Sequence, residues 1–391
     1  MTTKITRRSA IAAGLAVASI QPARAQVQGV SAGEIVIGTH LDLSGPVAAG
    51  MPALRFGMQH RIDEVNAAGG VNGRKLRLVV EDNGSQPQMA VRVTNKLIQQ
   101  DQVFAIVNPF GSGPNAAVVK RAVDAGILYF SPWGASSVLR QISNNSPLLF
   151  TTTPNYDSTV GKASAWAVDN FKATKVGFIY QEGPLGDLVR KGLVATLDAK
   201  GLKLVAEAGY KAGDIDFSSH VARMKAAGAE LIVAATITRE TVAVMAETKK
   251  LGWNDVKVLT ANPGRTAVVA RLGGASVEGL YGVGVWNAFS PRALPPVAAA
   301  WFEGFRKSYN YEFDENQYLA YAYTDWFLKG LAAAGPSPTQ QSVAEALGKI
   351  EAVSPIFYVP KRFVGGHVNP EDVRVEQIKD GDWVAVSDTL T

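Results

Sequence analysis

The chain has 391 residues, of which 47% are hydrophobic and 19% charged, a composition typical of a globular protein long enough for two domains. The formal net charge of +5 arises mainly at the N-terminus, because the first 25 residues hold four of the 39 basic residues and none of the 34 acidic ones. The remainder is nearly neutral, which gives no electrostatic reason to expect nucleic acid or an anionic membrane surface as a partner.

The first 25 residues have the pattern of an export signal. A basic start with Arg7 and Arg8 precedes an apolar run at 10–20, and Ala23-Arg24-Ala25 has the small–x–small pattern of a cleavage site. The arginine pair allows the twin-arginine route, so that route and the general secretory route both stay open. No other stretch approaches the roughly 20 apolar residues of a membrane helix. The absence of cysteine suits an oxidising compartment. The sequence thus predicts a periplasmic protein without direct membrane insertion.

From residue 34 onward, strand-like apolar runs alternate with amphipathic helical runs about every 25–30 residues, a period typical of βα units. Strands are expected at 34–41, 75–81, 103–107, 128–131, 176–180, 202–210, 231–235 and 256–260, and helices around 54–65 and at 87–100, 114–125, 187–200, 217–227 and 239–251. The two successive sets predict two α/β lobes with parallel-sheet cores. The rhythm then breaks, and helices at 301–309, 317–334 and 339–350 and strand-like runs within 357–386 are expected to complete the two lobes.

A glycine-rich loop, Asn108–Asn115, follows the apolar run at 103–107 and leads into a helix expected to begin at Pro114. Glycines let a backbone come close to a ligand, and the free N–H groups of a helix start attract an anion. Ligands of open parallel sheets bind at the carboxyl ends of the strands. We therefore expect a site for a small carboxylate here, facing the corresponding loops of the second lobe.

Residues 111–116 formally match the GxGxxA dinucleotide fingerprint, which requires an acidic residue at the end of the next strand. The available positions, 131–133, hold no carboxylate, so no nicotinamide cofactor is expected. The four histidines lack metal-motif spacing, and no GxSxG, P-loop or HExxH motif is present. No catalytic residue, cofactor or metal is predicted. An exported α/β enzyme stays open as an alternative, because dispersed catalytic residues leave no local motif.

Several stretches resemble the periplasmic binding proteins of branched-chain amino acid ABC importers, over about residues 33–386. They are 37–46, ending in Leu-Ser-Gly-Pro; 66–76, Asn-Ala-Ala-Gly-Gly-Val-Asn-Gly-Arg-Lys-Leu; 82–91; and Asp-Phe-Ser-Ser at 216–219. The resemblance implies the type I periplasmic binding fold, with two Rossmann-like lobes joined by crossovers near 154, 281–285 and 354–356. After the signal at 1–25, the N-terminal lobe would hold 33–153 and 286–354, and the C-terminal lobe 154–285 and 355–391. A monomer that closes on a small-molecule ligand and docks on membrane permease subunits is implied.

The resemblance also implies a ligand site. Relatives that bind leucine, isoleucine or valine hold the ligand carboxylate with the loops after the third and fourth strands. They clamp the amino acid with aromatic residues and place an acidic residue opposite its ammonium group. The corresponding carboxylate-binding residues here are Gly111, Ser112, Trp133, Gly134, Ala135 and Ser136, with Phe110 as a further ligand-binding residue. The clamp positions hold Gly50 or Met51, Leu185 and Ile237 or Thr238, and the acidic position holds Asn262.

The neutral amide of Asn262 is the departure with the clearest chemical consequence. A carboxylate facing an ammonium group makes a charge-assisted hydrogen bond, which an amide does not replace unless Glu182 or Glu240 reaches the amine. Trp133 is either a packing residue or, with Phe110 and Trp286, an aromatic wall of the pocket. An amino acid of the branched-chain type is the family-level expectation, and an aromatic or other organic carboxylate without an amine is the alternative. Ligand capture for chemosensing instead of transport stays open.

Overall fold

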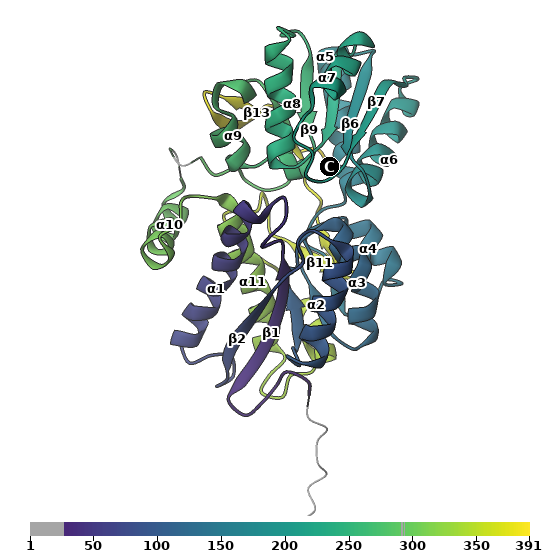
Figure 1. Cartoon of the computed structure of the whole chain (residues 1–391). Helices are drawn as coiled ribbons and strands as arrows, with labels where there is room; N and C mark the ends of the chain where they lie inside the picture. Colours follow the sequence, from purple (N-terminus) through teal and green to yellow (C-terminus); the bar gives the residue numbers. More distant parts are fainter. Residues whose placement is uncertain (1–26, 291, 293) are drawn as a thin grey trace, which may run out of the picture.

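The computed structural model describes residues 27–290, 292 and 294–391, so the expected export signal lies outside the described residues. The chain forms two α/β lobes, one above the other in Figure 1, each built on a sheet flanked by helices. This confirms the predicted α/β class with parallel-sheet lobes. Across the described part of the chain, no helix combines the length and apolar character that crossing a membrane requires.

The first lobe, the lower one in Figure 1, has a five-stranded parallel sheet in the order β2-β1-β3-β4-β5. Its central strands are short apolar runs buried on both faces, as parallel sheets covered by helices require. The elements are β1 (Glu34–Leu41), α1 (Met51–Ala67), β2 (Lys75–Asp82), α2 (Pro87–Gln99), β3 (Ala105–Val107), α3 (Ser112–Asp124), β4 (Leu128–Phe130), α4 (Ser136–Ile142) and β5 (Leu149–Phe150), with α11 (Glu315–Ala333) against α1 and α12 (Gln340–Leu347) against α11.

The second lobe, the upper one in Figure 1, has a seven-stranded sheet in the order β14-β13-β10-β9-β8-β6-β7. Its strands pair in parallel except that β13 pairs antiparallel with both of its neighbours, β10 and β14. It contains α5 (Tyr156–Phe171), β6 (Val176–Gln181), α6 (Pro184–Ala199), β7 (Leu204–Tyr210), α7 (Ser218–Ala226), β8 (Leu231–Ala235), α8 (Thr238–Lys250), β9 (Lys257–Thr260), α9 (Ala267–Gly273), β10 (Tyr281–Gly284), β13 (Arg374–Lys379) and β14 (Asp382–Ala385). The helices α4, α5 and α9 were not among those expected from the sequence.

The hairpin of β11 (Arg362–Val364) and β12 (His367–Asn369) belongs to the first lobe. The ring of Phe363 stacks on Trp326 of α11 with centroids 4.0 Å apart and meets Phe150 edge-on at 4.9 Å. The expected placement of 355–391 in the second lobe is therefore wrong for this hairpin, because its apolar face is buried under α11. Strand-like alternation does not reveal which lobe a strand joins. The chain then runs to β13 through residues 370–373. The other expected lobe boundaries remain predictions.

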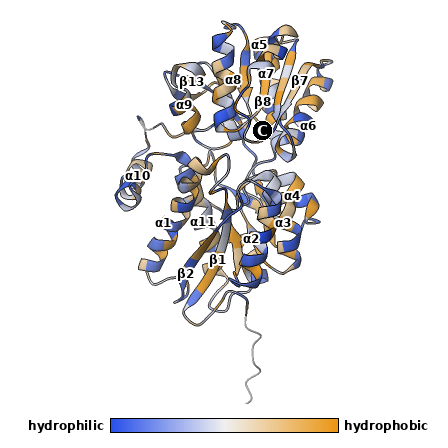
Figure 2. Ribbon diagram, viewed as in Figure 1, coloured by the Kyte–Doolittle hydropathy of each residue, from blue (hydrophilic) through white to orange (hydrophobic). Residues whose placement is uncertain are grey.

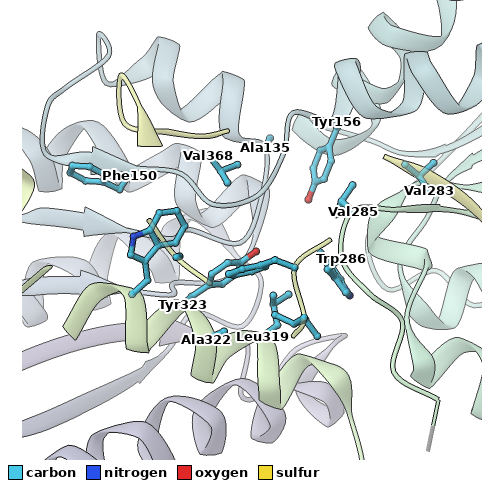
Figure 3. Packing of buried hydrophobic residues seen from close by; sticks show 14 of the residues in the cluster. Ala135, Phe150, Tyr156, Val283, Val285, Trp286, Leu319, Ala322, Tyr323 and Val368 are labelled. Atoms are coloured by element: carbon cyan, nitrogen blue, oxygen red, sulfur yellow. The ribbon is translucent and has the colours of Figure 1, made fainter. Parts of the chain in front are cut away.

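The core is continuous across the lobes. One cluster of buried side chains includes Phe130 and Tyr323 of the first lobe and Leu185 and Val233 of the second. Figure 2 shows hydrophobic residues concentrated on the sheets and hydrophilic ones on the outer helices, including α1 and α10 (Pro296–Tyr309). In Figure 3, Tyr156 and Tyr323 point into the same region between the lobes, with Trp286 alongside. The carboxyl ends of β3 and β4 lie on this side of the first sheet.

Candidate functional site

The two loops expected to hold a carboxylate are joined to each other. The N–H of Gly111 donates to the Trp133 carbonyl at 3.0 Å, and the N–H of Trp133 donates to the Pro109 carbonyl at 2.8 Å. Gly111 has a φ of 106°, which favours glycine, and caps α3. The helix begins at Ser112, two residues before the expected start, because Pro114 is tolerated in a first turn whose N–H groups have no intrahelical partner. Ser112 and Gly113 thus present their N–H groups at a helix start.

A buried hydrogen-bond chain supports this loop from behind. The amide nitrogen of Asn83 donates to Nδ1 of His40 at 2.9 Å, and Nε2 of His40 lies 3.0 Å from the Tyr129 hydroxyl. That hydroxyl donates to Oδ1 of Asn115 at 2.7 Å, and Nδ2 of Asn115 donates to the Pro109 carbonyl at 3.1 Å. Each step has one donor and one acceptor, so the chain requires a neutral His40 with its proton on Nε2. Burial lowers the pKa of His40 to about 3.

The neutral His40 predicts a specific pH dependence of stability. Its pKa is lower in the folded chain than the ordinary 6.5, so the stabilisation is present above pH 6.5 and is lost as pH falls from 6.5 toward 3. The slope from this one group approaches about 1.4 kcal/mol per pH unit in that window.

Urea titrations between pH 7 and 4 test this prediction, with His40→Gln as the variant and His220→Gln, at a partly exposed histidine of α7, as the control. The His40→Gln variant should start less stable and lose stability less steeply than the wild type. If the pH slope of the unfolding free energy is the same in His40→Gln and the wild type, folding does not lower the pKa of His40.

Ser112 and Gly134 face each other closely. A β-carbon at Gly134 would lie 2.9 Å from the Ser112 α-carbon, so this contact requires glycine. Ser112 also shares a side-chain hydrogen bond with Tyr156 of α5, whose pKa burial raises. The helix start of the first lobe is thereby connected to the first helix of the second.

The loop after β4 contributes one aromatic donor. The Trp133 ring packs edge-on against Tyr323 at 6.1 Å, and its Nε1 is buried without a hydrogen-bond partner. Ala135 is fully buried, and the Ser136 hydroxyl donates to the Thr153 carbonyl, so Ser136 does not offer that proton to a ligand. Phe110 packs beside Trp133 against the cluster around Leu54. Both readings of Trp133, packing residue and pocket wall, fit these contacts.

The second lobe contributes neutral groups. Leu185 is buried in the first turn of α6, within the cluster that spans both lobes, and Thr238 begins α8. Asn262, in a short 3-10 helix at Asn262–Gly264, is 4% exposed, and its Nδ2 is buried without a partner. Beside Gly264 lie the hydroxyls of three threonines, linked at 2.7–3.4 Å: Thr236, Thr241 and Thr260. The five side chains other than Leu185, namely Thr236, Thr238, Thr241, Thr260 and Asn262, offer hydroxyl and amide groups and carry no charge.

The two acids considered as substitutes for Asn262 differ. Glu182 is exposed. Glu240, in the first turn of α8, is buried with one oxygen unpartnered, and burial raises its pKa. A carboxyl whose pKa is raised ionises less readily than an ordinary one, which makes it less suited to pair with an ammonium group. Neither residue therefore replaces the missing carboxylate well.

A buried ionic cluster that no sequence motif indicates lies beside Asn262. Arg265 is fully buried; its Nε bonds Glu376 of β13 at 2.5 Å and its Nη1 bonds Glu315 of α11 at 3.2 Å. Its Nη2 donates to the carbonyl of Trp286, whose ring lies 5.7 Å from the guanidinium. Burial alone would lower the pKa of Arg265, but the two carboxylates outweigh it and raise that pKa. The cluster ties the second lobe to α11, and its members are too far apart in sequence to form a motif.

Residues 34–382 match the sequence profile of a family described as periplasmic binding protein. Over 308 residues the chain is 28% identical to an amino acid binding protein of Pseudomonas aeruginosa, covering 77% of this chain and 78% of that relative. A solute-binding protein of an ABC transporter from R. palustris, solved with benzoate, superimposes with a TM-score of 0.80 at 18% identity, covering 91% of this chain and 96% of that one. A branched-chain amino acid transporter substrate-binding protein from Streptococcus pneumoniae, solved with isoleucine, gives 0.74 at 24% identity, covering 90% and 99%. At these identities, the two structures establish a shared fold.

Proposed function

This chain belongs to the periplasmic binding protein family, and on that premise we propose that it captures a small carboxylate between its lobes for an ABC importer. The family resemblance and the type I periplasmic binding fold expected from the sequence are confirmed. The relatives and structural neighbours described above are binding proteins, and none is named as an enzyme. We further propose export to the periplasm by an undetermined route, a monomer, and docking on permease subunits after closure.

The unpartnered donors are the observation that supports a carboxylate ligand. Nε1 of Trp133 and Nδ2 of Asn262 are buried hydrogen-bond donors without acceptors, one from each lobe. An unpaired buried donor is costly, by about 1–3 kcal/mol; a carboxylate oxygen would satisfy that of Trp133, and an acceptor in place of the amine that of Asn262. The N–H groups at the start of α3 add further donors for the same charge.

Two ligand classes fit this proposal. The family and the isoleucine-bound neighbour support an amino acid. The neutral Asn262 amide, together with the raised pKa of the buried Glu240 carboxyl, supports an organic carboxylate without an amine, and the R. palustris neighbour was solved with benzoate.

A thermal-shift screen of matched pairs tests the proposal, because binding to the folded state raises the melting temperature. Leucine against 4-methylpentanoate, and phenylalanine against 3-phenylpropanoate, differ only in the amine, and benzoate is a further aromatic acid with a shorter chain. A ligand at 100 times its Kd stabilises by about 2.7 kcal/mol. Stabilisation by acids and not by their amides would support a carboxylate site. If no carboxylate stabilises the protein, or if a bound compound is chemically converted, the proposal fails.

Ser112→Asp should weaken any carboxylate ligand at least about tenfold, about 1.4 kcal/mol, because it places a like charge at the start of α3. Ser219→Asp, an exposed serine in the first turn of α7, is the matched control and should bind normally. Isothermal titration with the best ligand from the screen measures both. Equal affinity in the two variants would place the carboxylate elsewhere.

A further inference from the structure

A pocket of about 530 Å³ opens beside α4, apart from the residues proposed to bind the transported ligand. It is lined by one helix, the turn that follows it and two segments near the lobe crossings: Ser137, Arg140, Gln141, Asn144, Asn145, Asn155 and His367. Residues 151–155 connect β5 to α5, and β12, which holds His367, leads on to β13. The pocket therefore lies where the chain passes between the lobes.

Arg140 gives the pocket an uncompensated positive charge. Its Nη2 donates to Oδ1 of Asn145 at 3.2 Å, and its Nη1 is buried without a partner. Among the described residues, no carboxylate forms an ion pair with Arg140, and burial lowers its pKa. A partly buried guanidinium with a free N–H edge favours an anion, above all an oxyanion that accepts two hydrogen bonds.

The other lining groups are polar, and none is a carboxylate. The Ser137 hydroxyl is buried without a partner, as is Oδ1 of Asn155. His367 is engaged on both ring nitrogens, with the Thr151 hydroxyl at 2.6 Å and Glu371 at 2.7 Å. Glu371 is not among the lining residues, and the same oxygen that contacts His367 also accepts the Asn155 N–H. The pocket thus combines the Arg140 guanidinium, a free hydroxyl and several amides, without a lining carboxylate.

A second surface pocket shows the contrast. It measures about 590 Å³ and lies between α2 and α3, lined in part by Lys120, Arg121 and Asp124. Lys120 pairs with Asp124 at 2.7 Å, so this pocket carries its own counter-charge. A similar volume and an arginine therefore occur there beside a lining carboxylate, which the pocket beside α4 lacks.

We propose that the pocket beside α4 is a second binding site, which takes a small oxyanion such as phosphate on the Arg140 guanidinium with Ser137 and the surrounding amides. The anion would contact the first lobe through α4 and the crossing segments through Asn155 and His367. Its binding is independent of which solute the protein transports.

Inorganic phosphate is the first probe, with sulfate, acetate and chloride at matched ionic strength as parallel arms. Phosphate or another oxyanion should raise the melting temperature of the wild type and of Arg121→Gln but not of Arg140→Gln. The Arg140 side-chain NMR signal should shift in the same titration. An equal response of Arg140→Gln, or an equal response of the wild type to chloride, would overturn the site.

Two further variants keep the test decisive if Arg140→Gln folds poorly. Asn144→Asp adds a carboxylate at an exposed rim residue and should weaken the oxyanion at least about tenfold. Ser112→Asp, at the proposed solute site, should leave the oxyanion response unchanged. Loss of the response in Ser112→Asp with retention in Asn144→Asp would mean that the anion occupies the solute site, and the proposal would be wrong.

Discussion

Replacing Arg265 with methionine should lower the free energy of unfolding by about 3–5 kcal/mol, because it leaves two buried carboxylates without their cation. Glu376 is 3% exposed and Glu315 is fully buried. Burial already raises the pKa of Glu315 to about 7, against the opposing attraction of Arg265. Removing the guanidinium removes that attraction and also leaves the Trp286 carbonyl without its donor.

Urea denaturation followed by tryptophan fluorescence measures this loss, and Arg190→Met is the matched control. Arg190 makes a two-point contact with Glu207 at 2.7 and 2.8 Å, but its side chain is 47% exposed. An exposed pair contributes at most about 1 kcal/mol. The double variant Arg265→Met/Glu376→Gln should recover part of the loss, because one buried charge is then absent. A loss below about 1 kcal/mol in Arg265→Met would contradict the ionic role of the cluster.

The parts of the fold that depend on local pattern were predictable. The apolar runs that became β1, β6 and β8 are buried over most or all of their length, and strands covered on both faces are predominantly hydrophobic in sequence. The glycine-rich loop at 108–115 was expected after a buried strand and before a helix, and the structure joins it to the loop after β4. Both features follow from residues close together in sequence.

The parts that depend on distant pairing were not predictable. Arg265 lies 50 residues from Glu315 and 111 from Glu376, so no spacing indicated their contact. His40 is not part of any sequence motif, and only its buried hydrogen bonds with Asn83 and Tyr129 show that it links them as a neutral side chain. The β11–β12 hairpin was placed in the wrong lobe for the same reason, since its partner Trp326 lies in a distant helix.

Asn262 connects the predictable and unpredictable parts of the site. The family resemblance implied that Asn262 occupies the position where relatives have an acidic residue. The structure adds that its Nδ2 is buried without a partner. The adjacent threonine hydroxyls bond mainly to one another. The Asn262 amide therefore has an N–H donor left for a ligand. Such a donor favours a hydrogen-bond acceptor on the ligand over an ammonium group.

Asn262→Asp should shift the preference of the site toward amino acids by about 10–100-fold, because it replaces an unpaired donor with a charged acceptor. A charge-assisted hydrogen bond contributes about 1.5–3 kcal/mol, and each 1.4 kcal/mol is a factor of ten in Kd. The measurement is the ratio of Kd values for leucine and 4-methylpentanoate, by isothermal titration, in the wild type and the variant. Asn262→Leu, which keeps a similar volume without polarity, should weaken both ligands and leave the ratio close to that of the wild type. If Asn262→Asp leaves the ratio unchanged, residue 262 does not face the amine position, and Glu240→Gln becomes the variant that tests for its counter-ion.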